Sequence, residues 1–227
     1  MMTTIANWLD DRIGWRGIWE TIFLRKVPKV NWFYTLGSAT MVAALIQGVT
    51  GILLTMYYVP SPDSAYDSVQ YITNVVLMGW FIRGLHHWGA SAMVLLCVLH
   101  MLRVIFYGAY KYPREVTWFT GVLLLLITLA FGVTGYLLPW DQKAYWATTV
   151  VTKIASVTPF IGEWVLEVMR GGPSLSALTL ARFYGTHIWV LPAALIALIG
   201  FHLYLVIRLG ISAVPRRDEK AQEATEA

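Results

Sequence analysis

Four histidines lie in long apolar stretches of the chain, in two pairs with nearly equal separations. His86 and His100 are 14 residues apart, and His187 and His202 are 15 residues apart. An ionisable ring is costly in hydrocarbon, and such residues within membrane spans usually bind or carry something. The two pairs therefore predict two copies of one site, each holding a metal centre at a different depth in a membrane.

Helix geometry brings each pair to one face. Residues 14 apart fall within roughly 40° of each other and about 21 Å apart along the axis, whereas residues 15 apart differ by about 60° and 22 Å. Pro192 lies between His187 and His202. Because proline bends a helix and shifts its facing, we expect it to absorb the extra residue.

The elements that must position these residues are membrane spans. The 227 residues are 57% hydrophobic and only 13% charged, against about 25% charged in soluble domains. Four uncharged runs are each long enough to cross a bilayer, which is too many for the core of a soluble protein of this size. The sequence predicts an all-α, membrane-embedded four-helix bundle with spans at about 33–58, 79–107, 116–138 and 183–209.

Charges flank the spans and predict their orientation. Of the 17 basic residues, 12 lie before the first span, around the turn between the second and third spans, or after the last span. The positive-inside rule therefore places both termini in the cytoplasm. The net charge of +4 reflects these flanks and does not indicate nucleic-acid binding. We expect a cytoplasmic amphipathic segment at 1–32, the transmembrane domain at 33–209, short interfacial helices at 140–152 and 161–169, and a polar tail at 210–227.

The second and fourth spans run in the same direction, from outside to inside. His86 and His187 therefore lie near the outer surface, and His100 and His202 near the inner one. Two imidazoles that face each other across a gap suit a bis-histidine haem held between helices. A tetrahedral zinc site would need further ligands at the same depth, and the sequence has none there.

Glycines in the other two spans match these depths. Gly51 and Gly135 fall near the outer pair, and Gly37 and Gly121 near the inner pair. A missing side chain lets the edge of a flat ligand approach the backbone, although small residues also serve ordinary helix packing in membranes. Because four glycines match the depths of four histidines, we favour a bound flat ligand over ordinary helix packing.

Arginines near the histidines fit the anionic propionates of haem. Arg83 lies one turn outward from His86, and Arg103 about one turn inward from His100. Guanidinium groups pair well with carboxylates; the alternative is that both side chains reach for the membrane surface. Arg114 is a weaker candidate for the same role.

Several motifs together resemble a known family. They are Arg83–Ser91 (RGLHHWGAS), His100–Arg103 (HMLR), Tyr112–Trp118 (YPREVTW), Gly132–Asp141 (GVTGYLLPWD) and Ala181–Tyr184 (ARFY). Over residues 5–214 the chain resembles cytochrome b of quinol–cytochrome c oxidoreductases. The spacings of 14 and 15 are similar to those of the b6-type branch, in which cytochrome b is split, and the chain resembles its amino-terminal four-helix half.

The resemblance implies axial haem-iron ligands at His86, His187, His100 and His202, with two b haems, the outer of low and the inner of high potential. It implies an outer quinol-oxidation site lined by Phe131, Tyr136 and Trp140, and an inner quinone-reduction site for which Glu20 is a candidate. Electrons would cross the membrane from the outer to the inner site, with proton translocation.

The chain departs from the family pattern at two points. Thr35 stands where the b6 branch usually has a cysteine that holds a third, c-type haem, and a hydroxyl forms no thioether, so we expect no covalent haem. The Pro-Glu-Trp-Tyr motif is absent and would belong to a carboxy-terminal subunit. The resemblance further implies a Rieske iron–sulfur protein, a c-type cytochrome or plastocyanin-like acceptor, and a dimeric complex in a bacterial cytoplasmic or thylakoid-like membrane.

Residues 87–91 and 137–144 look closest to Gram-positive-type subunits, for which menaquinol is a plausible substrate. Two other functions stay open at this point. One is the haem b membrane anchor of a hydrogenase or formate dehydrogenase, and the other is a proton-coupled transporter without redox chemistry. The single cysteine, Cys97, excludes disulfides and a Cys-x-x-Cys-His haem attachment within the chain.

Overall fold

The computed structural model describes residues 2–23 and 32–212, and their regular structure is helical throughout. Four helical segments are long and apolar enough to cross a membrane. They are α3 (Leu36–Thr55) with a preceding 3-10 turn η1 (Trp32–Thr35), α5 (Gly79–Phe106), α6 (Glu115–Leu137), and a last span made of α9 (Ala177–Gly185), η2 (Thr186–Val190) and α10 (Leu191–Leu209). The predicted all-α, four-span architecture is confirmed.

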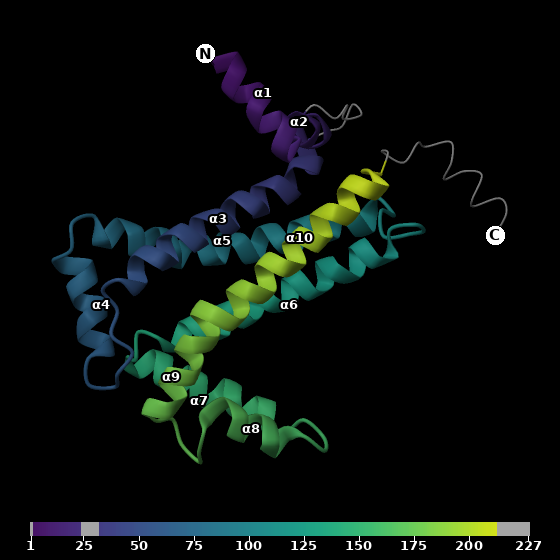
Figure 1. Cartoon of the computed structure of the whole chain (residues 1–227). Helices are drawn as coiled ribbons and strands as arrows, with labels where there is room; N and C mark the ends of the chain where they lie inside the picture. The colour runs from purple at the N-terminus through teal and green to yellow at the C-terminus, as the bar shows by residue number, and fades with distance from the viewer. Residues whose placement is uncertain (1, 24–31, 213–227) are drawn as a thin grey trace, which may run out of the picture.

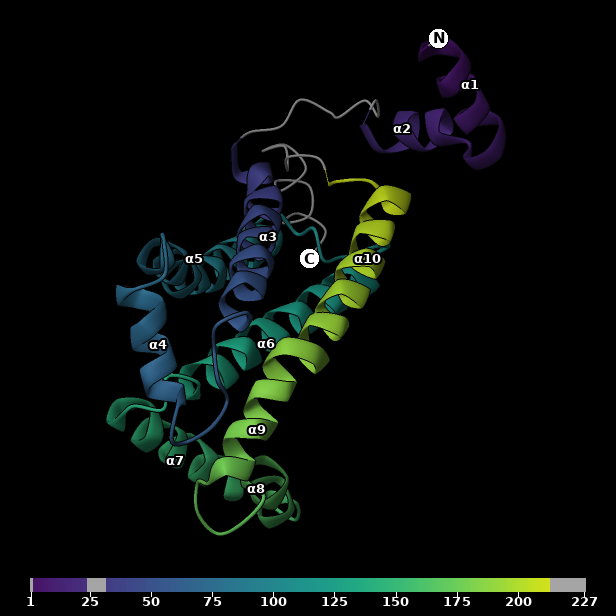
Figure 2. The ribbon, with the colours of Figure 1, turned by 60° about the vertical axis from the view of Figure 1, so that its left-hand side comes forward.

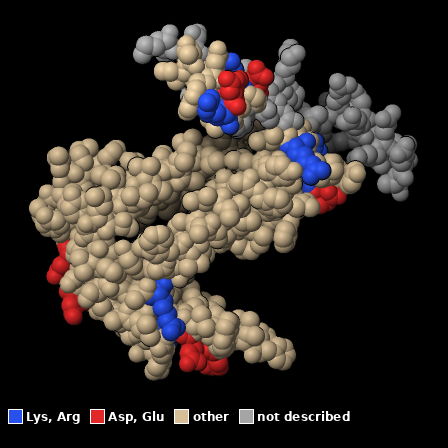
Figure 3. All heavy atoms as spheres, viewed as in Figure 1, with Lys and Arg blue, Asp and Glu red and all other residues tan. Residues whose placement is uncertain are grey.

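The spans pack mainly as two pairs. Helix α3 lies against α5, and α6 lies against α10, with α5 and α6 joining the pairs (Figures 1 and 2). Few of their side chains are buried within the chain, and large apolar residues such as Ile52, Phe106 and Ile196 are about 70% exposed. Charged residues gather at the two ends of the molecule, whereas its middle is uncharged in the view of Figure 3. This is the surface expected of a chain surrounded by lipid and partner subunits.

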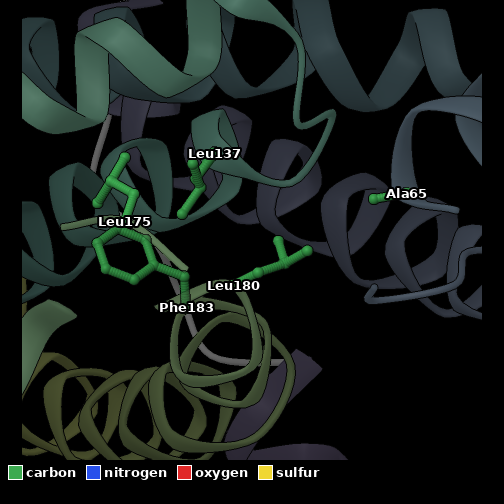
Figure 4. Packing of buried hydrophobic residues seen from close by; sticks show 5 residues of the cluster. All are labelled: Ala65, Leu137, Leu175, Leu180 and Phe183. Carbon is green, nitrogen blue, oxygen red and sulfur yellow. The ribbon is translucent and has the colours of Figure 1, made fainter. Parts of the chain in front are cut away.

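At one end, short helices form a compact cap that positions the outer histidines. It comprises α4 (Ala65–Asn74), α7 (Gln142–Ser156) and α8 (Gly162–Arg170) together with α9. Its core contains Ala65, Leu137, Leu175, Leu180 and Phe183, which are almost fully buried (Figure 4). The Asp141 side chain caps α7 by accepting a hydrogen bond of 2.7 Å from the backbone N–H of Ala144. The two predicted interfacial helices at 140–152 and 161–169 correspond to α7 and α8.

One helix boundary and one whole helix in this cap differ from the prediction. The last span begins at Ala177, not near residue 183, because Ser176 and Thr179 form a capping box that starts the helix soon after the Gly171-Gly172-Pro173 break. Helix α4 was not predicted at all. Its sequence is only weakly apolar, and its buried face packs mainly against α5, while Ala65 joins the core of the cap.

At the opposite end, hydrogen bonds join the starts of the first and third spans to the end of the last span. The Tyr34 hydroxyl donates to the Ser212 carbonyl at 2.8 Å, and the Arg114 side chain donates to the Gly210 carbonyl at 3.2 Å. The predicted amphipathic segment forms two helices rather than one, α1 (Met2–Ile13) and α2 (Trp15–Phe23), because Gly14 breaks it with a φ of 59°. The basic residues at 25, 26 and 29 and the tail from 213 onward lie outside the described residues.

Candidate functional site

The outer histidines face each other across the bundle. His86 projects from α5 and His187 from η2, and their ring centroids are 6.3 Å apart at an interplanar angle of 72°. A metal–nitrogen bond of about 2 Å on each side, with about 1.1 Å from each nitrogen to its ring centre, predicts about 6 Å between centroids. The separation therefore matches two imidazoles bound to opposite faces of one metal ion.

A π-helical turn explains the unequal spacings of 14 and 15 residues. In η2 the backbone N–H of Leu191 bonds to the carbonyl of Thr186, five residues earlier, so the turn contains one residue more than an α-helical turn. Pro192 follows immediately and has no N–H with which to continue the α-helical pattern. The one residue by which the second spacing exceeds the first is thus accommodated beside Pro192. It lies in a π turn, whereas the proline alone predicted a bend.

The inner histidines line a common cavity. His100 of α5 and His202 of α10 both face a cavity of about 320 Å³, which Gly37, Gly121 and Arg103 also line. This volume lies within the range typical of small-molecule and cofactor sites. The structure therefore brings the four histidines together as two pairs, His86 with His187 and His100 with His202; we call them the outer and the inner pair after the sides of the membrane that the sequence predicts for them.

Each predicted glycine touches one of the four histidines. A Cβ atom built on Gly135 would lie 2.7 Å from Cε1 of His187, and the same distances are 3.3 Å for Gly51 to His86, 3.2 Å for Gly37 to His100 and 3.6 Å for Gly121 to His202. The structure thus places each of these glycines beside the histidine that the sequence assigned to the same depth. The space left by each missing side chain is taken by an imidazole ring, so the glycines position the histidines directly.

Threonine hydroxyls hold three of the four imidazoles. Nδ1 lies 2.9 Å from the Thr50 hydroxyl in His86, 3.0 Å from Thr134 in His187 and 2.8 Å from Thr120 in His202. The sequence reasoning missed these residues. A signal was present, because each threonine directly precedes one of the four glycines.

The hydroxyl hydrogens fix the tautomer of these three rings. Thr50, Thr134 and Thr120 each donate a hydrogen bond of 2.6 to 2.8 Å to a carbonyl of their own helix. A hydroxyl has a single hydrogen, and when that hydrogen is donated to the helix carbonyl, the oxygen accepts from the imidazole in the tautomer that carries its proton on Nδ1. The lone pair of Nε2 is then free to bind a metal, which is the arrangement that a histidine ligand needs.

The two predicted arginines differ in their surroundings. Arg103 packs over the Tyr34 ring at 3.6 Å, and its Nε and Nη2 atoms are buried without a hydrogen-bond partner among the described residues. Arg83 is exposed on α5. Arg114 also lines the inner cavity. Two buried donors that face a cavity require an acceptor such as a carboxylate, and a haem propionate meets that requirement.

The remaining predicted residues occupy separate places. The Phe131 ring lies edge-on to His187, with centroids 5.3 Å apart. Tyr136 is 42% exposed, and Trp140 adopts a φ of 52° beside Tyr145. Glu20 is exposed on α2. These positions neither assemble nor exclude a quinone site within this chain.

The residues fit haem better than a metal held by protein alone. Within residues 2–23 and 32–212, no group of three or more His, Cys, Asp or Glu side chains gathers to bind an ion. Each site instead offers two imidazoles, glycines that make room for them and, at the inner end, unpaired cationic donors. Haem would supply the remaining iron ligands from its own ring, and the two histidines of each pair would hold it.

Comparison with known proteins assigns the family. Residues 22–210 match the family model "Cytochrome b/b6/petB". The chain belongs to the cytochrome b/b6 family. It is 45% identical over 212 residues to cytochrome b6 of Synechococcus elongatus, covering 93% of this chain and 99% of that protein. It is 44% identical to cytochrome b6 of Prochlorococcus marinus (strain MIT 9515), covering 92% and 97%.

A solved structure supports the same fold. A chain of the "Hyperthermophilic respiratory Complex III" superimposes with a TM-score of 0.82 at 35% identity, covering 91% of this chain and 55% of that one. This family member therefore spans about half the length of that structural relative. Membership of the cytochrome b/b6 family, which implies b haems, also decides between the cytochrome b function and the two alternatives left open by the sequence.

Proposed function

We propose that this cytochrome b6-type chain is the dihaem subunit of a bc-type quinol oxidoreductase complex, where it moves electrons across the membrane between two quinone sites. The observation that carries this proposal is the pair His86 and His187, opposed at 6.3 Å with Nδ1 of each ring committed to a threonine. Family membership supports the assignment to a bc-type complex. The chain is not active alone.

His86 and His187 would hold the outer b haem, and His100 and His202 the inner one. Bound haem supplies reversible one-electron chemistry at each depth. The chain orients the imidazoles through the glycines and threonines, and its apolar spans exclude water. Arg103 and Arg114 at the inner site, and Arg83 at the outer surface, would neutralise propionates.

We infer that the outer quinol site needs a second subunit. Phe131 lies at the His187 ring, while the side chains of Tyr136 and the neighbouring α7 surface, including Trp146 and Val150, are well exposed. With Trp140 these would form one wall, and a carboxy-terminal cytochrome b subunit that carries the Pro-Glu-Trp-Tyr motif would form the other. A Rieske iron–sulfur protein, a c-type cytochrome and a dimeric complex complete the proposal, with Glu20 as the candidate carboxylate near the inner site.

The direction of the chain in the membrane follows from its charges. We place the α1–α2 end in the cytoplasm, on the basic residues of its flanks. We also propose menaquinol as the quinol, on the expectation from the sequence that residues 87–91 and 137–144 resemble Gram-positive-type subunits. Thr35 supports the absence of a covalent haem, because its hydroxyl is engaged with the Trp32 carbonyl at 2.6 Å and cannot form a thioether. Cys97 is buried against Ala43 and Met93.

The test is the haem content and spectrum of the purified complex, with substitutions in this chain. We expect two bis-histidine, low-spin b haems per chain. His187→Leu should remove the outer haem and keep the inner one, and His100→Leu should do the reverse. His87→Leu is the matched control, because His87 is exposed and packs on Trp88. A wild-type complex without b haem, or simultaneous loss of both haems in each single variant, would contradict the proposal.

A further inference from the structure

One of the four histidines lacks the contact that the other three share. The threonines Thr50, Thr134 and Thr120 precede Gly51, Gly135 and Gly121, whereas the residue before Gly37 is Leu36. Correspondingly, Nδ1 of His100 is buried with no hydrogen-bond partner among the described residues. The ring is otherwise placed like the others, because it lies against Gly37 as they lie against their glycines.

The backbone that lies near His100 also differs from the backbone near the other three histidines. Carbonyl groups of Gln47, Phe131 and Thr117 interact with the other three imidazoles, and each lies four residues before the corresponding glycine. The equivalent residue for His100 is Phe33, which lies in the 3-10 turn η1 rather than in an α-helix. A 3-10 turn directs its carbonyls differently from an α-helical turn. Among the described residues, His100 therefore lacks both the hydroxyl and the carbonyl acceptor.

An acceptor at Nδ1 changes the electronic character of a histidine ligand. When Nδ1–H donates a hydrogen bond, the imidazole becomes a more basic ligand and its ring orientation is fixed. A more basic ligand stabilises the oxidised iron, which lowers the reduction potential. The outer site has two imidazoles of this kind, and the inner site has one.

We propose that the Thr-Gly pairs are positioning elements that set the haem potentials, and that Leu36, by leaving Nδ1 of His100 without an acceptor, makes the inner haem easier to reduce. This inference rests on the proposed dihaem function. Arg103 acts in the same direction, since a cation beside the inner cavity favours the reduced, less positive iron. The test must therefore alter the acceptors while Arg103 is kept.

The experiment is a redox titration of the two b haems in the purified complex, after haem content has been measured. Leu36→Thr introduces the missing hydroxyl and should lower the potential of the inner haem. Leu36→Val introduces a side chain of the same shape as threonine but without the hydroxyl, and should leave that potential unchanged. Thr120→Val should raise the inner potential, and Thr134→Val the outer one. We expect up to about a tenfold change in the ratio of oxidised to reduced haem, equivalent to about 59 mV for one electron.

Thr73→Val is the control for the threonine variants. Thr73 lies on α4, away from the inner cavity, and its hydroxyl donates to the Val69 carbonyl at 2.7 Å. Its replacement should shift neither haem. Two bound haems with unchanged potentials in Thr120→Val, or equal shifts in Leu36→Thr and Leu36→Val, would overturn this inference and leave the dihaem function intact. A wild-type complex without two b haems would overturn both.

Discussion

The two ends of the bundle satisfy their polar groups in opposite ways. At the outer end, both histidines have threonine partners and lie beneath a cap whose buried arginine, Arg170, is fully engaged. At the inner end, buried atoms of His100, Arg103, Thr117 and Ser212 have no hydrogen-bond partner in the described part of the chain. Buried polar groups are normally paired. The outer site is thus shaped by protein contacts, whereas the inner site is shaped to receive polar groups from a ligand.

The largest expected effect comes from Gly135 at the outer end, whose contact with a histidine is the closest of the four glycine contacts. A Cβ on Gly135 would lie 2.7 Å from the outer His187 ring, whereas a Cβ on Gly121 would lie 3.6 Å from the inner His202 ring. The first distance is shorter than the closest approach of non-bonded heavy atoms. The His187 ring cannot move aside without losing its hydrogen bond to Thr134 and its orientation. We expect Gly135→Ala to lose most of the outer haem and Gly121→Ala to keep the inner one, as measured by haem content per chain.

Gly48→Ala is the control for both variants, because a Cβ at Gly48 of α3 meets nothing within 4 Å. It should bind two haems like the wild type. Equal haem loss in Gly135→Ala and Gly121→Ala would show that the closeness of the glycine contact does not decide haem binding.

The next effect tests the outer cap. Arg170 is 7% exposed and donates to the Thr152 hydroxyl at 2.7 Å and to the carbonyls of Thr149 and Pro173. Hydrogen bonds from a charged group contribute about 1.5–3 kcal/mol, and unpaired buried acceptors add a further penalty. We expect Arg170→Met to lower the free energy of unfolding by about 3 kcal/mol, as measured by chemical denaturation in detergent.

Arg182→Met is the matched control for the cap. Arg182 also donates two hydrogen bonds to backbone carbonyls, those of Glu167 and Val168, but it is exposed to the surroundings. Its loss should cost below about 1 kcal/mol, since exposed groups can find other partners. If both variants lose the same stability, the burial of Arg170 does not matter to the cap.

The inner end is tested by its unpaired arginine. We expect Arg103→Gln to weaken inner haem binding by about tenfold, because about 1.4 kcal/mol of charge-assisted hydrogen bonding to a propionate is lost. Transfer of haem to an apo-globin acceptor measures the change. Arg83→Gln, at an exposed position on the same helix, should alter the outer haem less. A larger effect at Arg83 would reverse the assignment of the ligand-shaped site to the inner end.

The sequence predicted positions in this site better than it predicted contacts. Helix periodicity was enough to place His86 with His187, and to match each glycine to its depth, because rise and rotation per residue are constant. It could not show that Gly135 meets an imidazole, since side-chain contacts depend on how far apart the helices pack. The threonines were missed for the same reason, and because threonines in membrane helices commonly bond only to their own backbone.

The irregular elements were the hardest to predict. The π turn beside Pro192 was anticipated only as a bend, because a π turn and a proline kink both follow from a missing N–H. Helix α4 has too little apolar character to stand out, and its helical state depends on burial in the cap. The last span starts at Ala177 because Ser176 and Thr179 form a capping box. This short signal is hard to recognise directly after the Gly-Gly-Pro break.

The smallest expected effect concerns the link between the first span and the cap. Tyr58 donates a hydrogen bond of 2.7 Å to the Leu138 carbonyl and packs against Tyr184, with ring centroids 5.4 Å apart. Burial, aided by Tyr184, raises the pKa of the Tyr58 phenol, so it stays protonated and donates throughout the pH range in which the complex is stable. Tyr58→Phe should lower the free energy of unfolding by about 1 kcal/mol, equally at pH 6 and about pH 9. A loss that grows with pH would mean that the phenol ionises and that the outer cap is more open to water than its packing indicates.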